Sequence, residues 1–323
     1  MKRLTLLAAA ALLAAALPAE TWVDPKTGIP WNYTLADGKA ILGSLARSAK
    51  DIRPTNAIPQ SRAGWLFVPS VLDGHPVTAI APEAFSGCAR LSVVILPPGI
   101  TAIPEGTFEN CSSLKTVSLP DGLRTIGPNA FYGCTALSDL MIPDSVTAIG
   151  PGAFYRCSSL ATLRLPKGLT TIARWTFQDC AALTTVMIPD DIVAIELRAF
   201  YGCTSLTTVS LPDGLISIGV SAFAGCSELR TLTIPEKVAT IDRSAFANCT
   251  DLRKVTFLGA PMVFESFKGC RNLRVLNFKG SAKLISSFDG CSSLECVTLP
   301  PSGLRFLRVS FPDPEMIDFQ VVR

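Results

Sequence analysis

Apolar residues recur along most of the chain with a period of 23 residues. The stretch LKTVSLPDGLRTIGPNAFYGCTA, from Leu114 to Ala136, is one copy of the pattern. A period this short predicts a repeat solenoid, because a unit of that size cannot bury its apolar face alone and packs it against neighbouring copies. We expect about ten coils, the last two shortened to 21 residues, each marked by one phenylalanine: Phe85, Phe108, Phe131, Phe154, Phe177, Phe200, Phe223, Phe246, Phe267 and Phe288.

Four apolar positions of each copy form columns along the chain. In the copy quoted above and the residue that follows it, they are Ile126, Phe131, Cys134 and Leu137. The isoleucine is present in all eight 23-residue copies, and the cysteine and the leucine are present in all ten. Since equal positions of stacked coils lie above one another, we expect these columns to be the structural ladder of the core.

The polar positions between the columns predict the path of each coil. After the leucine, residues alternate as in Thr116–Leu119, which predicts a short strand with Val117 inward and Ser118 outward. A proline turn follows, and then a second extended piece that ends at the isoleucine. The spacing of phenylalanine and cysteine suits a short helical or 3₁₀ turn, and the residue before the cysteine suits a left-handed backbone, with Arg156 fitting poorly. Stacking such coils predicts a right-handed curved solenoid with a parallel β-sheet on its concave face.

The repeat does not extend to either end of the chain. Residues 1–19, MKRLTLLAAAALLAAALPA, have a basic start, a short apolar run and a small-residue end, which predicts a signal peptide cleaved after Ala19. The alternative, a membrane anchor, needs about 20 apolar residues, so we expect no stable membrane insertion once this segment is removed. We assign residues 20–63 to an N-terminal cap and loop, sealed by Trp22 and Trp31, residues 64–299 to the repeats, and residues 300–323 to a C-terminal cap.

Composition supports one continuous core and excludes one class of partner. Hydrophobic residues are 48% of the chain and charged residues 17%. The formal net charge of +3 falls to +1 when Lys2 and Arg3 leave with the signal peptide. A protein with so little excess positive charge has no electrostatic footprint for nucleic acid.

The consensus of the copies, LxxVxLPxxLxxIGxxAFxGC, resembles the BspA-like class of leucine-rich repeat proteins. The opening VPSVLDGHPVTAI, which contains His75, adds to the resemblance, and the match covers roughly residues 64 to 300. It implies a leucine-rich-repeat-like solenoid, export from the cell, and binding to other proteins, including host matrix components in some members. It also implies a binding module without catalysis.

The column of ten cysteines has two interpretations. Ladder neighbours about 4.8 Å apart fall within the Cα range of a disulfide. We favour buried reduced thiols, because parallel side chains in a packed ladder cannot pair without distorting the stack. The eleventh cysteine, Cys296, is expected on an outward strand position. Regular spacing without histidine does not resemble a set of metal ligands.

No residue pattern predicts catalysis, a cofactor or a metal. His75 is the only histidine and lies in a DGHP turn without a nucleophile motif, so we favour a solvated turn residue over a catalytic base. Acidic residues follow several turn prolines, which raises the alternative of calcium, but aspartate is an ordinary turn residue. This acidic column consists of Asp121, Asp144, Asp190, Asp213 and Glu236, and Lys167 interrupts it.

The outward row of the sheet is the candidate binding surface. Most of its residues are threonine, serine or other small polar types, which an exposed strand also prefers without any ligand. The more apolar positions are where we expect contact with a partner. The candidate residues are Val93, Ile95, Met141, Arg164 and Met187.

These observations favour an exported, non-catalytic interaction or adhesion protein that holds a protein or a surface polymer. Its location would be the medium, the cell surface or the periplasm. The alternative is a structural or assembly component of the bacterial envelope or periplasm that self-associates. A hydrolase is the weakest hypothesis, because the chain offers no machinery for it.

Overall fold

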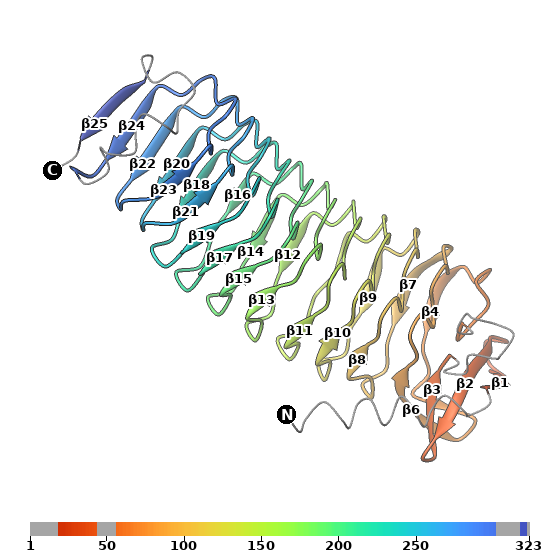
Figure 1. The fold of residues 1–323 in the computed structure, drawn as a ribbon. Coiled ribbons are helices and arrows are strands. Elements are labelled where there is room, and N and C mark those ends of the chain that lie inside the picture. The colour runs from red at the N-terminus through yellow and green to blue at the C-terminus, as the bar shows by residue number, and fades with distance from the viewer. Residues whose placement is uncertain (1–18, 44–55, 302–316, 322–323) are drawn as a thin grey trace, which may run out of the picture. The chain divides into compact units, whose positions relative to one another are not determined.

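The computed structural model describes residues 19–43, 56–301 and 317–321. Apart from Ala19, the predicted signal peptide lies outside the described residues, as does most of the predicted C-terminal cap. The chain divides into two compact units, Met1–Ala153 and Phe154–Arg323, and each is described by itself. In both, short parallel strands of successive coils lie side by side and turns join them (Figure 1), which confirms the predicted repeat solenoid.

Five strands form one sheet at the N-terminal end of the first unit. Their order is β1-β2-β3-β6-β5, with antiparallel pairing from β1 to β3 and parallel pairing of β3 with β6. Trp31 and Tyr33 on β2 are each 1% exposed and fill the core beneath this sheet. The bounds are β1 (Ala19–Val23), β2 (Pro30–Ala36), β3 (Lys39–Leu42), β5 (Val71–Leu72) and β6 (His75–Ile80).

The repeats of the first unit form two parallel ladders. One has the order β4-β7-β9 and follows the leucine column, and the other has the order β11-β10-β8 and ends in the isoleucine column. The bounds are β4 (Gly64–Phe67), β7 (Leu91–Ile95), β9 (Thr116–Ser118), β8 (Ala102–Ile103), β10 (Thr125–Ile126) and β11 (Ala148–Ile149).

The strand predicted around Asp139 and Met141 is wrong. Only an isolated bridge joins Thr116 to Asp139. The backbone N–H groups of Ser138 and Asp139 both donate to the carbonyl oxygen of Lys115, at 3.2 and 3.4 Å. In this coil the regular ladder of the first unit therefore ends in a single bridge.

The second unit contains three parallel ladders. Two follow the leucine column, with the orders β12-β14-β16 and β18-β20-β22-β24-β25, and the third follows the isoleucine column with the order β13-β15-β17-β19-β21-β23. The bounds are β12 (Thr162–Arg164), β13 (Thr171–Ile172), β14 (Thr185–Met187), β15 (Ala194–Ile195), β16 (Thr208–Val209), β17 (Ser217–Ile218), β18 (Thr231–Ile234), β19 (Thr240–Ile241), β20 (Lys254–Phe257), β21 (Met262–Phe264), β22 (Val275–Phe278), β23 (Lys283–Ile285), β24 (Cys296–Leu299) and β25 (Asp318–Val321).

The predicted ladder residues form the core. Phe131, Cys134 and Leu137 are 0% exposed, and Ile126 is 1% exposed. Phenylalanines of neighbouring coils stack nearly parallel in both units, with ring centroids 5.0 to 5.5 Å apart. Each coil therefore buries its apolar side chains against equivalent side chains of its neighbours, as the period predicts.

The segment between phenylalanine and cysteine is a turn. Within the part of the chain that the structure describes, no helix occurs. The Cys134 N–H donates to the Phe131 carbonyl at 3.1 Å, and the Phe108 N–H donates to the Ala130 carbonyl of the next coil at 2.8 Å. All ten residues before the cysteines have the predicted left-handed backbone, including Arg156 at φ 60°.

A second left-handed column, two residues before each phenylalanine, was not predicted. Its residue types are mixed and include Glu83, Trp175 and Arg198, at φ 58°, 61° and 53°. A non-glycine residue in this conformation costs roughly 1–2 kcal/mol, because its Cβ approaches the following carbonyl oxygen. The full column is Glu83, Gly106, Asn129, Gly152, Trp175, Arg198, Ser221, Ser244, Glu265 and Ser286.

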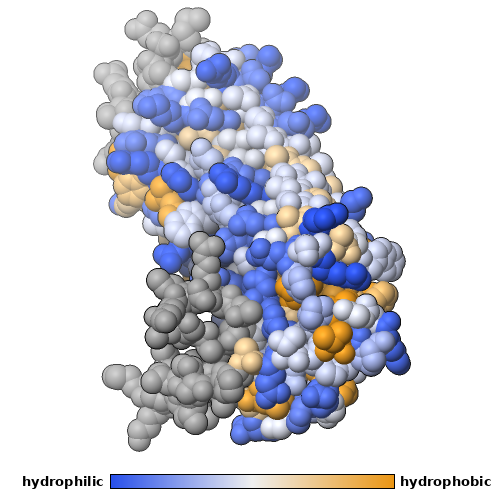
Figure 2. Space-filling view, turned by 90° about the vertical axis from the view of Figure 1, so that its right-hand side faces the viewer, coloured by the Kyte–Doolittle hydropathy of each residue, from blue (hydrophilic) through white to orange (hydrophobic). Residues whose placement is uncertain are grey.

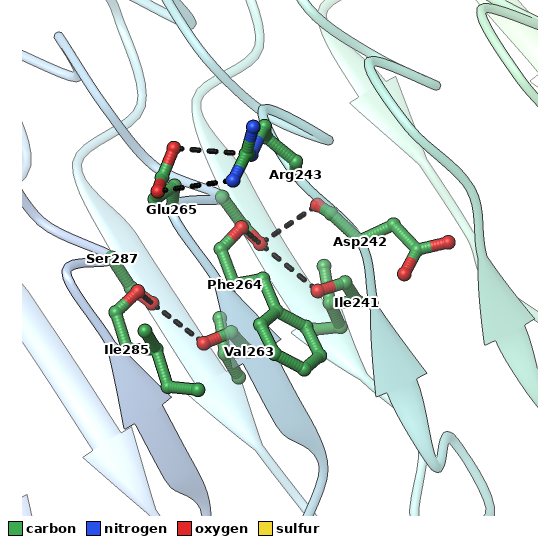
Figure 3. Close-up of polar contacts among 9 residues, drawn as sticks. Ile241, Asp242, Arg243, Val263, Phe264, Glu265, Ile285 and Ser287 are labelled. Carbon is green, nitrogen blue, oxygen red and sulfur yellow. Dashed lines mark hydrogen bonds and ion pairs between the residues drawn. The ribbon is translucent and has the colours of Figure 1, made fainter.

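The two shortened coils use buried serines where six of the other coils have alanine before the phenylalanine. The Ser266 hydroxyl lies 3.1 Å from the Ile241 carbonyl oxygen and 2.9 Å from that of Asp242, and the Ser287 hydroxyl donates to the Val263 carbonyl at 2.9 Å (Figure 3). Both serines are 0% exposed. Each hydroxyl also lies close to a carbonyl oxygen of its own coil, that of Phe264 at 2.7 Å for Ser266 and that of Ile285 at 2.9 Å for Ser287.

The cysteine column is made of buried thiols that point at the preceding coil. Most thiols of the column donate a weak hydrogen bond to the carbonyl oxygen of the phenylalanine one coil earlier, for example Cys134 to Phe108 at 3.0 Å and Cys226 to Phe200 at 3.3 Å, whereas Cys88 accepts from the side-chain amide of Asn56 at 3.8 Å. All eleven cysteines are free, and Cys296 alone is half-buried rather than buried. The column therefore fills space and satisfies backbone acceptors, as the reduced-thiol interpretation predicts.

Removing one ring from the phenylalanine ladder tests the cooperativity of the stack. Phe200 is 0% exposed and stacks on Phe177 and Phe223 at 5.3 and 5.0 Å. We expect Phe200→Ala to lower the free energy of unfolding by about 3–5 kcal/mol, because it opens a cavity between two rings. Urea unfolding followed by circular dichroism measures the change, with Phe200→Leu as the milder control. A loss below about 1 kcal/mol would contradict a ladder that depends on every ring.

The thiol column makes stability depend on pH. Burial raises the pKa of Cys134 to about 12, against an ordinary value of 9.0. Unfolded thiols lose their protons above pH 9 while native ones keep them, so the stabilisation is complete below pH 9 and is lost as the pH rises towards 12. We expect the free energy of unfolding in urea, with reductant present, to fall between pH 8 and pH 10. Cys134→Ala and Cys203→Ala should each make the fall shallower, and an unchanged pH dependence would be the opposing result.

Candidate binding surface

Side chains of the outward row point away from the core, as predicted, and most are exposed. Thr162, Thr185, Thr231 and Thr233 are exposed on β12, β14 and β18 of the second unit. In the first unit, Val93 and Ile95 on β7 are half-buried. The row therefore presents polar hydroxyls over much of its length and becomes apolar on β7.

An aromatic strand that the sequence analysis did not include lies beside β7. Trp65 and Phe67 on β4 are 59% and 61% exposed, and their ring centroids lie 6.1 Å apart. β4 pairs in parallel with β7, so that Trp65 stands opposite Val93 and Phe67 opposite Ile95. We call these four side chains the aromatic patch. Together they form an apolar surface on the outward face of the first unit.

The 23-residue period does not reveal this patch. Trp65 lies 28 residues before Val93, because this coil is longer than 23 residues and the register shifts by one further residue between Gly64 and Trp65. The available signal was the alternation in GWLFV, where Trp65 and Phe67 alternate with the buried Leu66 and Val68. Such alternation is typical of a half-buried strand.

None of the other candidate residues lies on β4 or β7. Met141, 81% exposed, belongs to the first unit but to the coil whose strand is missing. Arg164 and Met187, both exposed, are paired neighbours on β12 and β14 of the second unit. In the first unit, Val93 and Ile95 share β7 while Met141 lies on a later coil, and in the second unit Arg164 and Met187 stand opposite each other.

Two open depressions flank Met187, which is 68% exposed. One has a volume of about 430 Å³ and is lined by Arg164, Lys167 and Asp190 among others. The second, of about 460 Å³, lies on the other side, where β16 is followed by β18. Shallow depressions of this kind can receive protruding side chains of a partner, but they do not enclose a small molecule.

The space-filling view shows how limited the exposed apolar surface is. Hydrophobic side chains form small separate groups among polar ones (Figure 2). Ion pairs are also sparse in the described part of the chain, where Arg243 pairs with Glu265 at 3.2 Å and Arg274 with Glu295 at 3.7 Å, both exposed. Exposed ion pairs of this kind contribute little to the stability of the fold.

Acidic side chains gather on the turns of the first unit. Burial raises the pKa of the Glu109 carboxyl, and the nearby charges of Glu83 and Glu105 raise it further. Among residues 19–43, 56–301 and 317–321, no group of three or more histidine, cysteine or acidic side chains has the geometry to hold a metal ion.

His75 directly follows the turn at Asp73 and Gly74 and is half-buried. It begins β6, and its Nδ1 atom lies 3.1 Å from the carbonyl oxygen of Gly38. This nitrogen therefore carries the proton, and the ring ties the turn between β2 and β3 to the first coil.

In the described residues, no helix is long and apolar enough to span a membrane.

Sequence comparison finds the repeat in one protein family. The family model described as BspA type leucine rich repeat region (6 copies) matches residues 78–203 and 170–295. Together the two matches run through most of the coils described above. No curated protein shows significant similarity to the chain.

Solved structures show the same fold. A leucine-rich repeat protein from Bacteroides ovatus is 21% identical, with a TM-score of 0.58 over 94% of this chain and 98% of that one. A leucine-rich cell surface protein from Faecalibacterium prausnitzii is 24% identical, with a TM-score of 0.58 over 94% and 95% of the two chains. A leucine-rich repeat protein from T. pallidum is 29% identical, with a TM-score of 0.52 over 65% of this chain and 87% of that one.

Proposed function

Because this chain belongs to the BspA-type leucine-rich repeat family, we propose that it is an exported, non-catalytic binding protein that holds a protein partner. Leucine-rich repeat solenoids are generally non-catalytic, and they present extended surfaces for binding. Export is supported by the signal-peptide pattern of residues 1–19 and by the description of the F. prausnitzii protein as a cell surface protein. The partner meets the outward row at the cell surface, in the periplasm or in the medium.

The aromatic patch carries this proposal. Trp65 and Phe67 expose more than half of their surface. On β9 of the same ladder, the equivalent outward positions hold a threonine and a serine. Large exposed aromatics cost solubility, and in protein interfaces tryptophan and other aromatic side chains contribute most of the binding energy. Val93 and Ile95 extend the same apolar surface over the next strand.

The chemistry of the patch favours a protein over a small molecule. Its four side chains lie on two paired strands and carry no charge, so they form a platform rather than an enclosed pocket. A partner with a complementary apolar face would cover Trp65 and Phe67 and exclude water from them. Met141, Arg164 and Met187 are then secondary contacts for a partner that extends along the row.

Charges placed on the two aromatic positions test the patch. We expect Trp65→Lys/Phe67→Lys to weaken binding to a matrix-protein partner at least about tenfold, because a lysine cannot be buried at the centre of an apolar interface without a partner. Surface plasmon resonance against a panel of immobilised extracellular-matrix proteins measures the affinity. Circular dichroism should show an unchanged fold, since both side chains are exposed.

The matched control is Thr231→Lys/Thr233→Lys, which adds the same charge at two exposed outward positions of β18 in the second unit. It should retain the affinity of the unmodified protein. An equal loss in both variants would show a general effect of charge and contradict a site at the patch. Single Met141→Lys and Met187→Lys variants measure whether the secondary positions contribute.

One observation favours the alternative of an assembly component. In the described part of the chain, β25 has a sheet neighbour on one side only, and its residue Val321 is 44% exposed. An edge strand of this kind can pair with the edge of another chain. Sedimentation that shifts to larger species with concentration, and that is abolished by Val321→Pro, would support self-assembly through this edge. A constant sedimentation coefficient over the same range would reject it.

A further inference from the structure

Three successive coils at the start of the second unit each place an arginine over an aromatic ring. The distances from the guanidinium carbon to the ring centroid are 5.3, 5.0 and 5.3 Å. A buried glutamine, 7% exposed, lies among them and donates to the hydroxyl of Tyr155 at 3.3 Å. The cluster consists of Tyr155 with Arg156, Trp175 with Arg174, Tyr201 with Arg198, and Gln178. We call it the arginine–aromatic cluster.

Backbone hydrogen bonds make these coils direct neighbours. The Arg156 N–H donates to the Gln178 carbonyl at 2.9 Å, and the Trp175 N–H donates to the Leu197 carbonyl of the following coil, also at 2.9 Å. The stacked core phenylalanines beneath them are 5.5 and 5.3 Å apart. The three arginine–aromatic pairs therefore follow one another along the turn face, one pair for each step of the ladder.

Backbone conformation indicates that this cluster is not a product of folding alone. Arg156, Trp175 and Arg198 all occupy left-handed positions, at φ 60°, 61° and 53°. Equivalent positions elsewhere hold glycine, asparagine, aspartate or serine, apart from Glu83 and Glu265. Bulky side chains in this conformation are strained, and such strain concentrates at binding sites. Here three consecutive coils each hold one bulky side chain in this strained conformation.

The cluster presents the groups that recognise charged sugars. A guanidinium stacked on a ring has a fixed orientation, and the N–H groups along its edge match the paired oxygens of a carboxylate or a sulfate. Arg156, Arg174, Arg198 and Tyr201 are exposed, while Trp175 is half-buried. Aromatic rings also pack against the flat C–H faces of sugar rings, which a purely basic surface cannot do.

Two carboxylates border the cluster. Glu196 accepts a hydrogen bond from the backbone N–H of Arg174 at 3.0 Å, and Asp179 lies beside Gly202 of the next coil. Three guanidinium groups outnumber these two carboxylates, and the Glu196 carboxylate is already engaged by the backbone. The cluster is thus an anion-selective surface of modest charge, so its specificity must come from stacking as well as from charge.

We propose that the arginine–aromatic cluster binds an acidic polysaccharide whose sugar rings carry carboxylate or sulfate groups. The cluster lines neither of the depressions beside Met187, and its repetition along three coils suits an extended polymer. A nucleic acid would need a larger excess of positive charge. An acidic peptide would find no apolar groove for its side chains, so the stacked rings favour the sugar.

Biolayer interferometry with defined polymers tests the proposal. The immobilised probes are polygalacturonate, dextran sulfate, neutral dextran, poly-L-glutamate and duplex DNA, at an ionic strength of about 0.15 M. We expect the purified protein to bind polygalacturonate or dextran sulfate and to bind the other three at least about tenfold more weakly. Arg174→Gln/Arg198→Gln should weaken binding to the acidic polysaccharide at least about tenfold.

The control removes the same charge elsewhere in the second unit. Arg243 occupies the same column as Arg174 but pairs with Glu265 (Figure 3), and Arg253 is exposed on a neighbouring face. Arg243→Gln/Arg253→Gln should retain full affinity. Trp175→Gly separates binding from folding, because it removes the strain and the ring together. It should bind at least about tenfold more weakly while its thermal midpoint stays the same or rises.

Four results would overturn the proposal. They are no binding to either acidic polysaccharide, equal or tighter binding to poly-L-glutamate, equal or tighter binding to duplex DNA, and an equal loss of affinity in the two double-arginine variants. The second would identify an acidic protein segment as the ligand and the third a nucleic acid. The fourth would show non-specific attraction between charges. Selective loss in Arg174→Gln/Arg198→Gln, with the fold intact, supports it.

Discussion

The structure depends on a fixed register between neighbouring coils. Backbone N–H groups of one coil donate to carbonyl groups of the next, as Phe131 does to Ala153 at 2.8 Å, and this pairing places identical side chains on top of one another. No coil has a core of its own. The stacked rings, thiols and leucines are shared between neighbours, and stability is therefore a property of interfaces between coils rather than of single coils.

The same register explains why cysteine suits its column. The side chain must fit into a closely packed ladder and face the phenylalanine carbonyl of the preceding coil, at 3.0 to 3.3 Å in the coils described. Alanine would leave a void and an acceptor without this contact. A thiol fills the space and donates a weak hydrogen bond to this carbonyl oxygen. It therefore packs well and gives the buried acceptor a partner, without the desolvation cost of a more polar group.

A register that repeats the core also repeats the surface, and the two proposed binding surfaces are departures from the repeat. Threonine and serine along the outward row fit any exposed strand, whereas Trp65 and Phe67 do not. The turn face shows the same contrast, since most coils relieve its left-handed positions with small residues and three coils place Arg156, Trp175 and Arg198 there. Both departures expose aromatic surface at a cost that folding alone does not require. They lie in different units and present different chemistry, one apolar and one cationic.

The sequence by itself determined the solenoid, its core columns and the left-handed position before each cysteine. These features repeat about ten times. The same packing requirement selects the same residue type in each coil, as in the columns that contain Phe131 and Cys134. Only the tertiary structure decided which surface side chains meet. The register shift at Gly64 aligns Trp65 with Val93, and only a single bridge forms at Asp139, where the period predicts a strand. The second left-handed column was not predicted because no single residue type marks it. Its ten positions include glutamate, glycine, tryptophan and serine. Contacts that recur in every coil follow from the period of the sequence, whereas contacts found at single coils depend on local shifts of register that are fixed only when the coils stack.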